Sequence, residues 1–135
     1  MSRRIVAENI RLRRAYDSAS SSDGARILID RLWPRGVRKA DAAIDVWAKD
    51  IAPSTALRRW FGHDPARWHE FRRRYSEEIH RRRNRLDELR TLAQKGRITL
   101  VFAARDEAHN DAVVLREILL GRSIPRRPPL RSHSL

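Results

Sequence analysis

Residues 27–36 read Ile-Leu-Ile-Asp-Arg-Leu-Trp-Pro-Arg-Gly, an apolar run that ends in an acid, two arginines and a tryptophan. The run Ile27-Leu28-Ile29 predicts a buried strand. Pro34 fixes its own φ and pushes Trp33 toward an extended conformation, while Gly36 allows a positive φ. We therefore expect the residues after Ile29 to present guanidinium groups at the carboxyl end of a strand, as a site for an anion would require.

A second strand followed by a polar turn lies near the other end of the chain. Residues 98–104 read Ile-Thr-Leu-Val-Phe-Ala-Ala and are apolar on both faces, as central strands are. Residues 105–110 form the turn that leads into the next helix, whose free N–H groups favour anions. Ligands of open α/β sheets bind outside the carboxyl ends of the strands. If the two strands are parallel, both turns lie at that edge.

The two turns supply the candidate site residues. Arginine offers two parallel donors to a phosphate or a carboxylate, and histidine can transfer a proton near neutral pH. We predict ligand binding by Arg31, Trp33, Arg35, Arg105 and Asn110, and acid–base roles for Asp30 and His109. The five histidines show no metal-ligand spacing and no Gly-rich phosphate loop is present, so we expect neither a metal nor a cofactor.

Each candidate also has a structural interpretation that the sequence leaves open. Asp30 alternates with Leu28 and could be the internal partner of a neighbouring arginine, because an unpaired buried carboxylate is costly. Trp33 could be a packing anchor, and Asn110 could bond only to the backbone. Asp106 is most simply the N-cap of the last helix.

The remaining periodicity predicts an α/β fold in a single domain. Alternation predicts a strand near residues 10–13, and the apolar run predicts one near 26–32; their short connection favours an antiparallel arrangement if they pair. Helices are expected over residues 41–51, after the caps Ser54 and Asp64 with a break near 80–84, and over 112–120. The expected architecture is a small mixed sheet of about three or more strands with about five helices over residues 1–121, followed by a basic, Pro/Arg-rich disordered tail at 122–135.

Composition narrows the function classes. The chain of 135 residues has no cysteine, which excludes disulfides, a thiol nucleophile and Cys-ligated metals. It has no apolar run long enough to span a bilayer and no secretory signal, so a cytoplasmic protein without a membrane partner is expected. Lys and Arg number 30 against 17 Asp and Glu, giving a net charge of +13. Nonspecific nucleic-acid binding through the Arg-rich helices at 67–85 and the tail is therefore the alternative function.

Five segments in order resemble the YeaO-like branch of the family known as domain of unknown function 488. They are Asp30 to Gly36, Ala52 to Arg58, Trp60 to Asp64, Phe71 to Tyr75, and Phe102 to Asp106 with His109-Asn110. The resemblance covers about residues 8 to 120 and implies an α/β domain without an assigned activity. More distant relatives look as though they carry cysteines near the last strand, where this chain has Ala103 and Ala104, so thiol chemistry does not carry over.

Three hypotheses follow. The first is binding, with or without catalytic turnover, of a small phosphate- or carboxylate-bearing ligand at the carboxyl edge of the sheet. The second is a nucleic-acid-associated basic module, and the third is a structural or interaction protein whose arginines only tie loops to the core. The sequence does not identify the ligand, a reaction or the oligomeric state.

Overall fold

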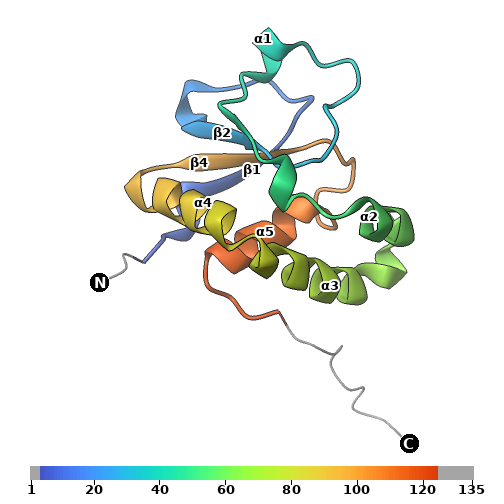
Figure 1. Ribbon diagram of the computed structural model, residues 1–135. Helices are drawn as coiled ribbons and strands as arrows, with labels where there is room; N and C mark the ends of the chain where they lie inside the picture. The colour runs from blue at the N-terminus through green and yellow to red at the C-terminus, as the bar shows by residue number, and fades with distance from the viewer. Residues whose placement is uncertain (1–3, 125–135) are drawn as a thin grey trace, which may run out of the picture.

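The computed structural model describes residues 4–124, which form an α/β domain around a four-stranded sheet (Figure 1). The strands are β1 (Ile10–Arg14), β2 (Ala25–Leu28), β3 (Val46–Trp47) and β4 (Ile98–Phe102), in the spatial order β1-β4-β2-β3. All three pairings are parallel. The α/β fold is thus confirmed, but the sheet is parallel where a mixed sheet was expected.

The antiparallel arrangement was expected only if the first two strands pair, and they do not pair with each other; both run parallel to β4. β4 lies between them, and residues 15–24 run back from the carboxyl end of β1 to the start of β2 without an α-helix. Gly24 closes this connection with a φ of 65°. A Cβ atom there would lie 1.9 Å from the carbonyl oxygen of Arg97, so only glycine fits.

The described residues contain five α-helices and four short 3₁₀ turns. The helices are α1 (Lys39–Ala42), α2 (Thr55–Phe61), α3 (Trp68–Arg81), α4 (Arg83–Lys95) and α5 (Asp111–Leu119). The turns are η1 (Ala7–Asn9), η2 (Ser21–Asp23), η3 (Lys49–Ile51) and η4 (Pro65–Arg67). Ser54 caps α2 as expected, its Oγ accepting from the Leu57 N–H at 3.1 Å. The expected break falls at Arg82, between α3 and α4.

The helix expected over residues 41–51 is not formed. Ala43 adopts the left-handed conformation and ends α1 after one turn. Val46 and Trp47 then pair with β2 as the edge strand β3. The apolar residues that share one helical stripe in the sequence lie on two faces of the sheet: Ala48 and Ile51 in the main core, Ile44 and Trp47 on the opposite side.

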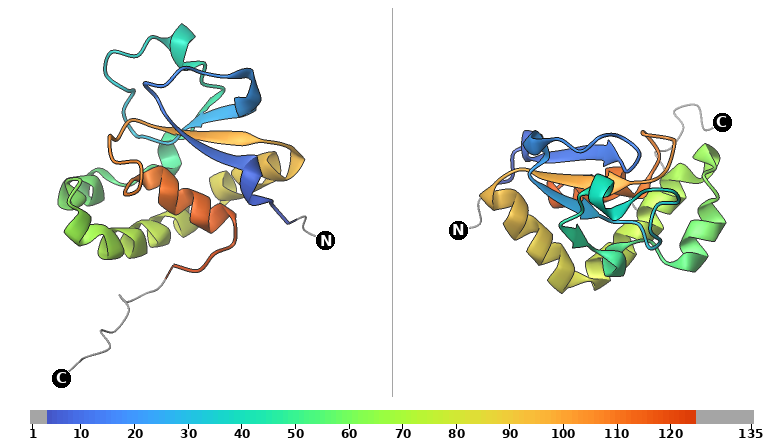
Figure 2. Two further views of the ribbon diagram at one scale, coloured as in Figure 1. Left: turned by 180° about the vertical axis from the view of Figure 1, so that it is seen from behind. Right: turned by 90° about the horizontal axis from the view of Figure 1, so that it is seen from above.

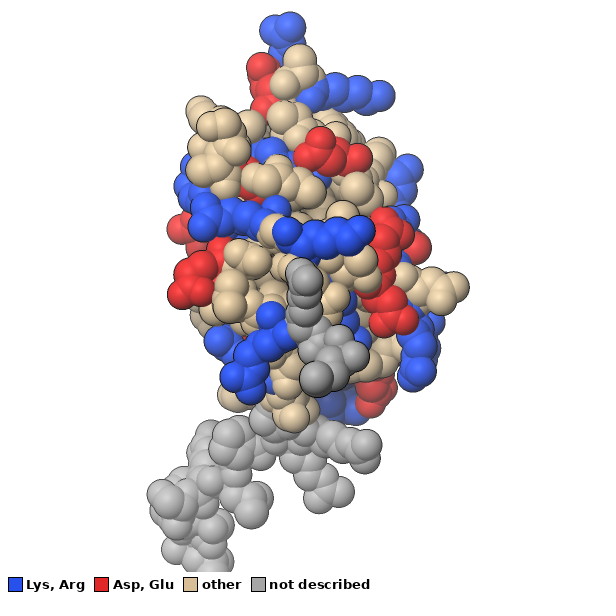
Figure 3. All heavy atoms as spheres, turned by 90° about the vertical axis from the view of Figure 1, so that its left-hand side faces the viewer, with Lys and Arg blue, Asp and Glu red and all other residues tan. Residues whose placement is uncertain are grey.

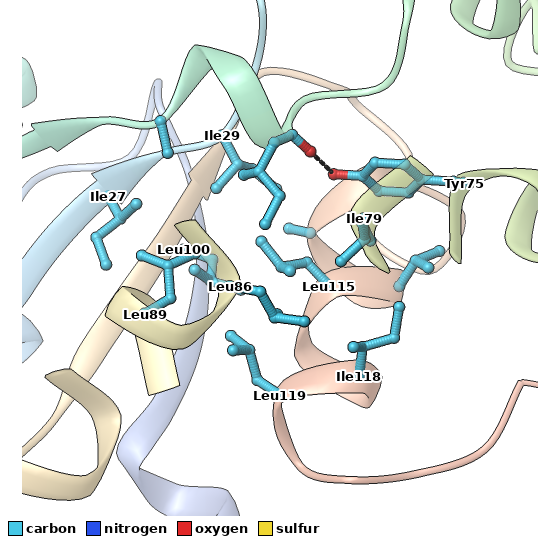
Figure 4. Close-up of a cluster of buried hydrophobic side chains, with 14 of the residues drawn as sticks. Ile27, Ile29, Tyr75, Ile79, Leu86, Leu89, Leu100, Leu115, Ile118 and Leu119 are labelled. Atoms are coloured by element: carbon cyan, nitrogen blue, oxygen red, sulfur yellow. Dashed lines mark hydrogen bonds between the residues drawn. The ribbon is translucent and has the colours of Figure 1, made fainter. Parts of the chain in front are cut away.

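The main core lies between the sheet and the helices α3, α4 and α5, which cover one face (Figures 1 and 2). Alternate residues of β4, Ile98, Leu100 and Phe102, point into it. Figure 4 shows these helices contributing Ile79, Leu89 and Leu115 to the same cluster, with the buried Tyr75 hydroxyl donating to the Ile51 carbonyl at 2.7 Å.

The opposite face of the sheet is covered by loop segments and α1 instead of long helices (Figure 2). Leu28 and Val101 are buried there against Trp33 and Trp47, whose rings meet edge to face with centroids 5.4 Å apart. Trp33 therefore has the anchoring role that the sequence left open. The turn after β2 is held to the sheet by its own tryptophan.

None of the helices between residues 4 and 124 has the length and apolar character needed to cross a membrane. Most of the tail expected at 122–135 lies outside the described residues, so its disorder stays a prediction. The parallel sheet brings the carboxyl ends of β2 and β4 to one edge, which is where both polar turns begin.

Candidate functional site

A cleft of about 690 Å³ opens at the carboxyl ends of β2 and β4, between the two polar turns, α2 and the start of α5. In Figure 1 the turn after β4, in orange, lies on the same side of the molecule as α2, and the view from behind in Figure 2 agrees. All seven residues predicted from the sequence line this cleft: Asp30, Arg31, Trp33, Arg35, Arg105, His109 and Asn110. The two turns therefore lie together as the edge-of-sheet argument expected, and the roles of these residues stay predictions.

Three arginines of the lining have exposed side chains with no hydrogen bond or ion pair to any described residue. Arg35 comes from the turn after β2, Arg105 from the turn after β4, and Arg58 from α2. Arg58 was not predicted, because its position depends on α2 packing beside the sheet edge. Guanidinium groups from three separate segments thus share one cleft and keep their donors available.

Arg31 is different, because its guanidinium is used inside the protein. Its Nε donates to the Pro53 carbonyl at 3.2 Å, and Nη2 lies 3.4 Å from the Ala52 carbonyl. These bonds tie the turn after β2 to the segment that leads into α2. Arg31 therefore has a structural role that the sequence did not reveal, and its contact with a ligand stays a prediction.

Asp30 does not neutralise either neighbouring arginine. Its Oδ2 accepts the backbone N–H of Ala103 at 2.8 Å, which extends the contact between β2 and β4 beyond their last paired residues. Its backbone carbonyl accepts the Trp47 Nε1–H at 2.8 Å. The Asp30 carboxylate is thus bonded to the backbone directly after β4 and not to an arginine.

Asp111, the first residue of α5, is the functional candidate that the sequence reasoning missed. Its carboxyl group is hydrogen-bonded to that of Asp30. Burial, and then the charge of Asp30 and this hydrogen bond, raise the pKa of Asp111 well above its usual range. Burial also raises the pKa of Tyr75, and the charges of Asp111 and Asp30 are smaller causes of the same shift. The raised pKa of Asp111 favours its protonated form, which can donate this hydrogen bond to the carboxyl group of Asp30 in the cleft lining.

The turn after β4 is built around Asp106, but not as the expected helix cap. The N-cap of α5 is Asn110, whose Oδ1 accepts the Val113 N–H at 3.1 Å and whose Nδ2 donates to the Asp106 carbonyl at 2.9 Å. Asn110 is buried, and both ends of its amide are occupied. The open structural interpretation of Asn110 is therefore the one the contacts support.

His109 is held in a fixed orientation at the cleft wall. Its Nδ1 lies 2.9 Å from Oδ2 of Asp106, and its ring meets Trp68 edge to face at 5.1 Å. The imidazole hydrogen bond, followed by backbone N–H groups, lowers the pKa of Asp106. Because Nδ1 of His109 is bound to Asp106, Nε2 is the ring nitrogen that is left for a ligand.

The lining contains no serine, threonine, lysine or tyrosine among the described residues, and the chain has no cysteine. Nucleophilic catalysis by a hydroxyl, amine or thiol thus has no group in the described cleft wall. Within residues 4–124, no group of three or more His, Asp or Glu side chains is placed to hold a metal ion. The cleft lining therefore combines arginine guanidinium groups, the hydrogen-bonded carboxyl pair of Asp30 and Asp111, the oriented imidazole of His109, and apolar side chains.

Comparison with known proteins gives one family and several relatives. Residues 9–129 match the family model described as the inactive DUF488-N3 subclade. The chain is 44% identical over 113 residues to the uncharacterized protein Rv3073c of Mycobacterium tuberculosis, covering 84% of this chain and 95% of the relative. It is 42% identical over 111 residues to the uncharacterized protein YeaO of Escherichia coli, covering 82% of this chain and 96% of that protein. No solved structure matches at a significant level.

Proposed function

The chain belongs to the DUF488 family, and for a member matched to its inactive DUF488-N3 subclade we propose binding without turnover, of a small ligand that carries a phosphate or carboxylate. The site is the cleft at the carboxyl edge of the sheet. The observation that carries the proposal is the convergence there of Arg35, Arg58 and Arg105, none of which is paired with a carboxylate of the described chain. The description of the subclade as inactive, and a described cleft wall without a hydroxyl, amine or thiol nucleophile, favour binding over catalysis.

The contrast with other arginines supports this assignment. On α3, Arg72 pairs with Glu117, Arg73 with Glu70 and Glu77, and Arg74 with Glu70. These cations are neutralised by neighbouring carboxylates and leave little charge for a ligand. The cleft arginines lack such partners within the described residues, so their charge is available to an anion.

Adjacent arginines on α2 provide a sharp test. We expect inorganic phosphate, titrated at constant ionic strength and followed by amide chemical shifts, to bind about tenfold or more weakly to Arg58→Ala and to Arg105→Ala, as loss of a charged hydrogen bond implies. Arg59→Ala is the matched control, because Arg59 is also exposed on α2 but does not line the cleft. Equal phosphate affinity in all three variants would refute the proposal.

Nucleic-acid association is the second candidate. It is favoured by the net charge of +13 and by the exposed run Arg81–Arg83, whose side chains have no carboxylate partner among the described residues. Figure 3 shows basic and acidic side chains interspersed on the face that it views. The acidic side chains reduce the positive potential that a nucleic-acid backbone would need on this face. This candidate requires steeply salt-dependent binding of DNA or RNA that is reduced by removing residues 122–135. An affinity for DNA or RNA that stays the same as the salt concentration rises, or no binding at low salt, would count against this candidate.

A purely structural role is the third outcome of the same experiments. It requires that Arg35→Ala lowers the thermal stability and that no cleft arginine affects phosphate binding. The absence of cysteine from the sequence suits the cytoplasmic location that we include in the proposal.

A further inference from the structure

We propose that the ligand of the cleft is an aromatic acid, in which a phosphate or carboxylate is attached to an aromatic or heteroaromatic ring that lies along the apolar wall. The inference rests on the proposed function, because it uses the same cleft and the same arginines. It adds the chemical class of the rest of the ligand. Three features of the cleft carry it.

The first feature is size and polarity. A volume of about 690 Å³ is in the range of pockets that enclose a drug-sized molecule, far more than an isolated phosphate fills. Most of the accessible wall is apolar, and its apolar residues with exposed or half-buried side chains are Leu32, Trp33, Ala103 and Ala104. A ligand made only of polar groups would leave this wall in water, whereas an apolar body would cover it.

The second feature is a set of aromatic rings already fixed in place. Phe61 and Phe71 are stacked with centroids 4.3 Å apart and an interplanar angle of 21°. The indole N–H of Trp33 donates to the Val37 carbonyl at 2.7 Å, and its ring is braced by Trp47. Because Phe61 and Phe71 are only 5% and 2% exposed, the half-buried ring of Trp33 is the one with surface for a ligand ring, and it loses little freedom when the ligand binds.

The third feature is the distribution of charge. The arginines Arg35, Arg58 and Arg105 are exposed, whereas Phe61, Phe71 and Pro53 are buried, so the cations lie toward solvent and the rings toward the interior. The carboxyl groups of Asp30 and Asp111 also line the cleft and are half-buried, less exposed than the three arginines. Negative charge at the less exposed residues and positive charge at the exposed ones orient a ligand with its acid outward and its neutral ring inward.

Leu32 connects this interior wall with the mouth of the cleft. It is 58% exposed, more than any other large hydrophobic side chain of the described residues. Single exposed leucines are common on protein surfaces. Leu32, however, continues the wall formed by Trp33 and Pro34, so a ring seated there would cover it.

Calorimetric titration of the full chain with four probes tests the inference: inorganic phosphate, glycerol phosphate, phenyl phosphate and benzoate. We expect phenyl phosphate to bind at least about tenfold more tightly than inorganic phosphate, which corresponds to burying one face of a ring, and also more tightly than glycerol phosphate. Tighter binding of phenyl phosphate than benzoate identifies the acid as phosphate, and the reverse order identifies it as carboxylate; either order supports the aromatic class.

Variants then place the ring. Leu32→Ser is expected to reduce the preference for phenyl phosphate over inorganic phosphate, and ring protons of bound phenyl phosphate should show NOEs to Leu32 methyl protons in the natural chain. Val6→Ser is the control, since Val6 is 51% exposed and lies outside the cleft. Equal affinities for all three phosphates would overturn the aromatic class and leave the proposed function standing. If no probe binds, both are overturned.

Discussion

The carboxyl groups of Asp30 and Asp111 are hydrogen-bonded to each other where the turn after β2 meets the start of α5. Burial is the largest cause of the raised pKa of Asp111, and the charge of Asp30 and this hydrogen bond add to it. The pair joins the turn after β2 to the start of α5 by a contact between two acids, not by an ion pair to an arginine.

This pair makes stability depend on pH. A group whose pKa is raised in the folded state stabilises the fold below its unfolded pKa and loses that stabilisation as the pH rises through the folded pKa. Asn cannot ionise, so we expect the Tm of Asp111→Asn to rise relative to that of the natural chain, by several degrees, as the pH increases above about 4, the ordinary pKa of an aspartate.

Asp106→Asn is the control for this prediction. The pKa of Asp106 is lowered, so its contribution is present above the unfolded pKa and is lost only as the pH falls through the folded pKa. Asp106→Asn should therefore gain nothing at high pH. Parallel pH profiles of Tm for the natural chain and Asp111→Asn would contradict the raised pKa of Asp111.

Arg31 and Arg105 should differ sharply in their effect on stability. Arg31→Ala removes the donors held by the Ala52 and Pro53 carbonyls and is expected to lower the free energy of unfolding by about 1–2 kcal/mol. Arg105→Ala removes an exposed side chain without a described partner and should change it by less than about 0.5 kcal/mol. Urea unfolding of both variants measures this, and equal losses would show that Arg105 also has a structural contact.

Gly24 should be far less tolerant of substitution than Gly36. Both have a positive φ, 65° and 78°, so each Ala variant bears the cost of a left-handed residue, about 1 kcal/mol. At Gly24 the added Cβ also collides with the Arg97 carbonyl, while at Gly36 nothing lies within 4 Å. We expect Gly24→Ala to lose more than about 2 kcal/mol and Gly36→Ala about 1 kcal/mol in denaturant unfolding. Similar losses would mean that the loop moves away from Arg97 at little cost.

Glu78 is predicted to stabilise α2 from the neighbouring helix. Its carboxylate accepts both the backbone N–H and the hydroxyl of Ser54, each at 2.7 Å. Glu78→Ala should therefore cost about 2 kcal/mol, because two hydrogen bonds to a charged group are lost at the start of α2. Glu88→Ala removes an exposed ion pair with Arg85 and should cost less than about 0.5 kcal/mol. Thermal unfolding compares the two, and an equal cost would mean that the bonds from Ser54 to Glu78 add nothing to the stability of the cap.

The sequence predicted those parts of the molecule that local chemistry determines. Ser54 marks the start of α2 because capping depends on a few neighbouring atoms, and the break expected near residues 80–84 falls at Arg82. The edge rule brought Asp30 and Arg105 into one cleft because parallel strands must end on the same side.

The errors concern residues whose surroundings come from distant parts of the chain. Val46 and Trp47 follow a helical periodicity, but pairing with β2 and the bond from Trp47 to Asp30 favour a strand. Asp111 looks like an ordinary acid of a first helical turn until β2 places Asp30 beside it. Arg58 became a site candidate only once α2 was located. The conformation and surroundings of these residues depend on tertiary contacts, which local patterns in a single sequence do not specify.

The insertion of β4 between β1 and β2 imposes an order on folding during synthesis. A nascent chain that ends at residue 97 has β1 and β2 but lacks the strand that joins them, so the edges they will offer to β4 stay unpaired. The sheet can close only after Ile98–Phe102 has left the ribosome, and α5 must follow to cover it. Interrupted synthesis would leave open strand edges, on which a second chain can add.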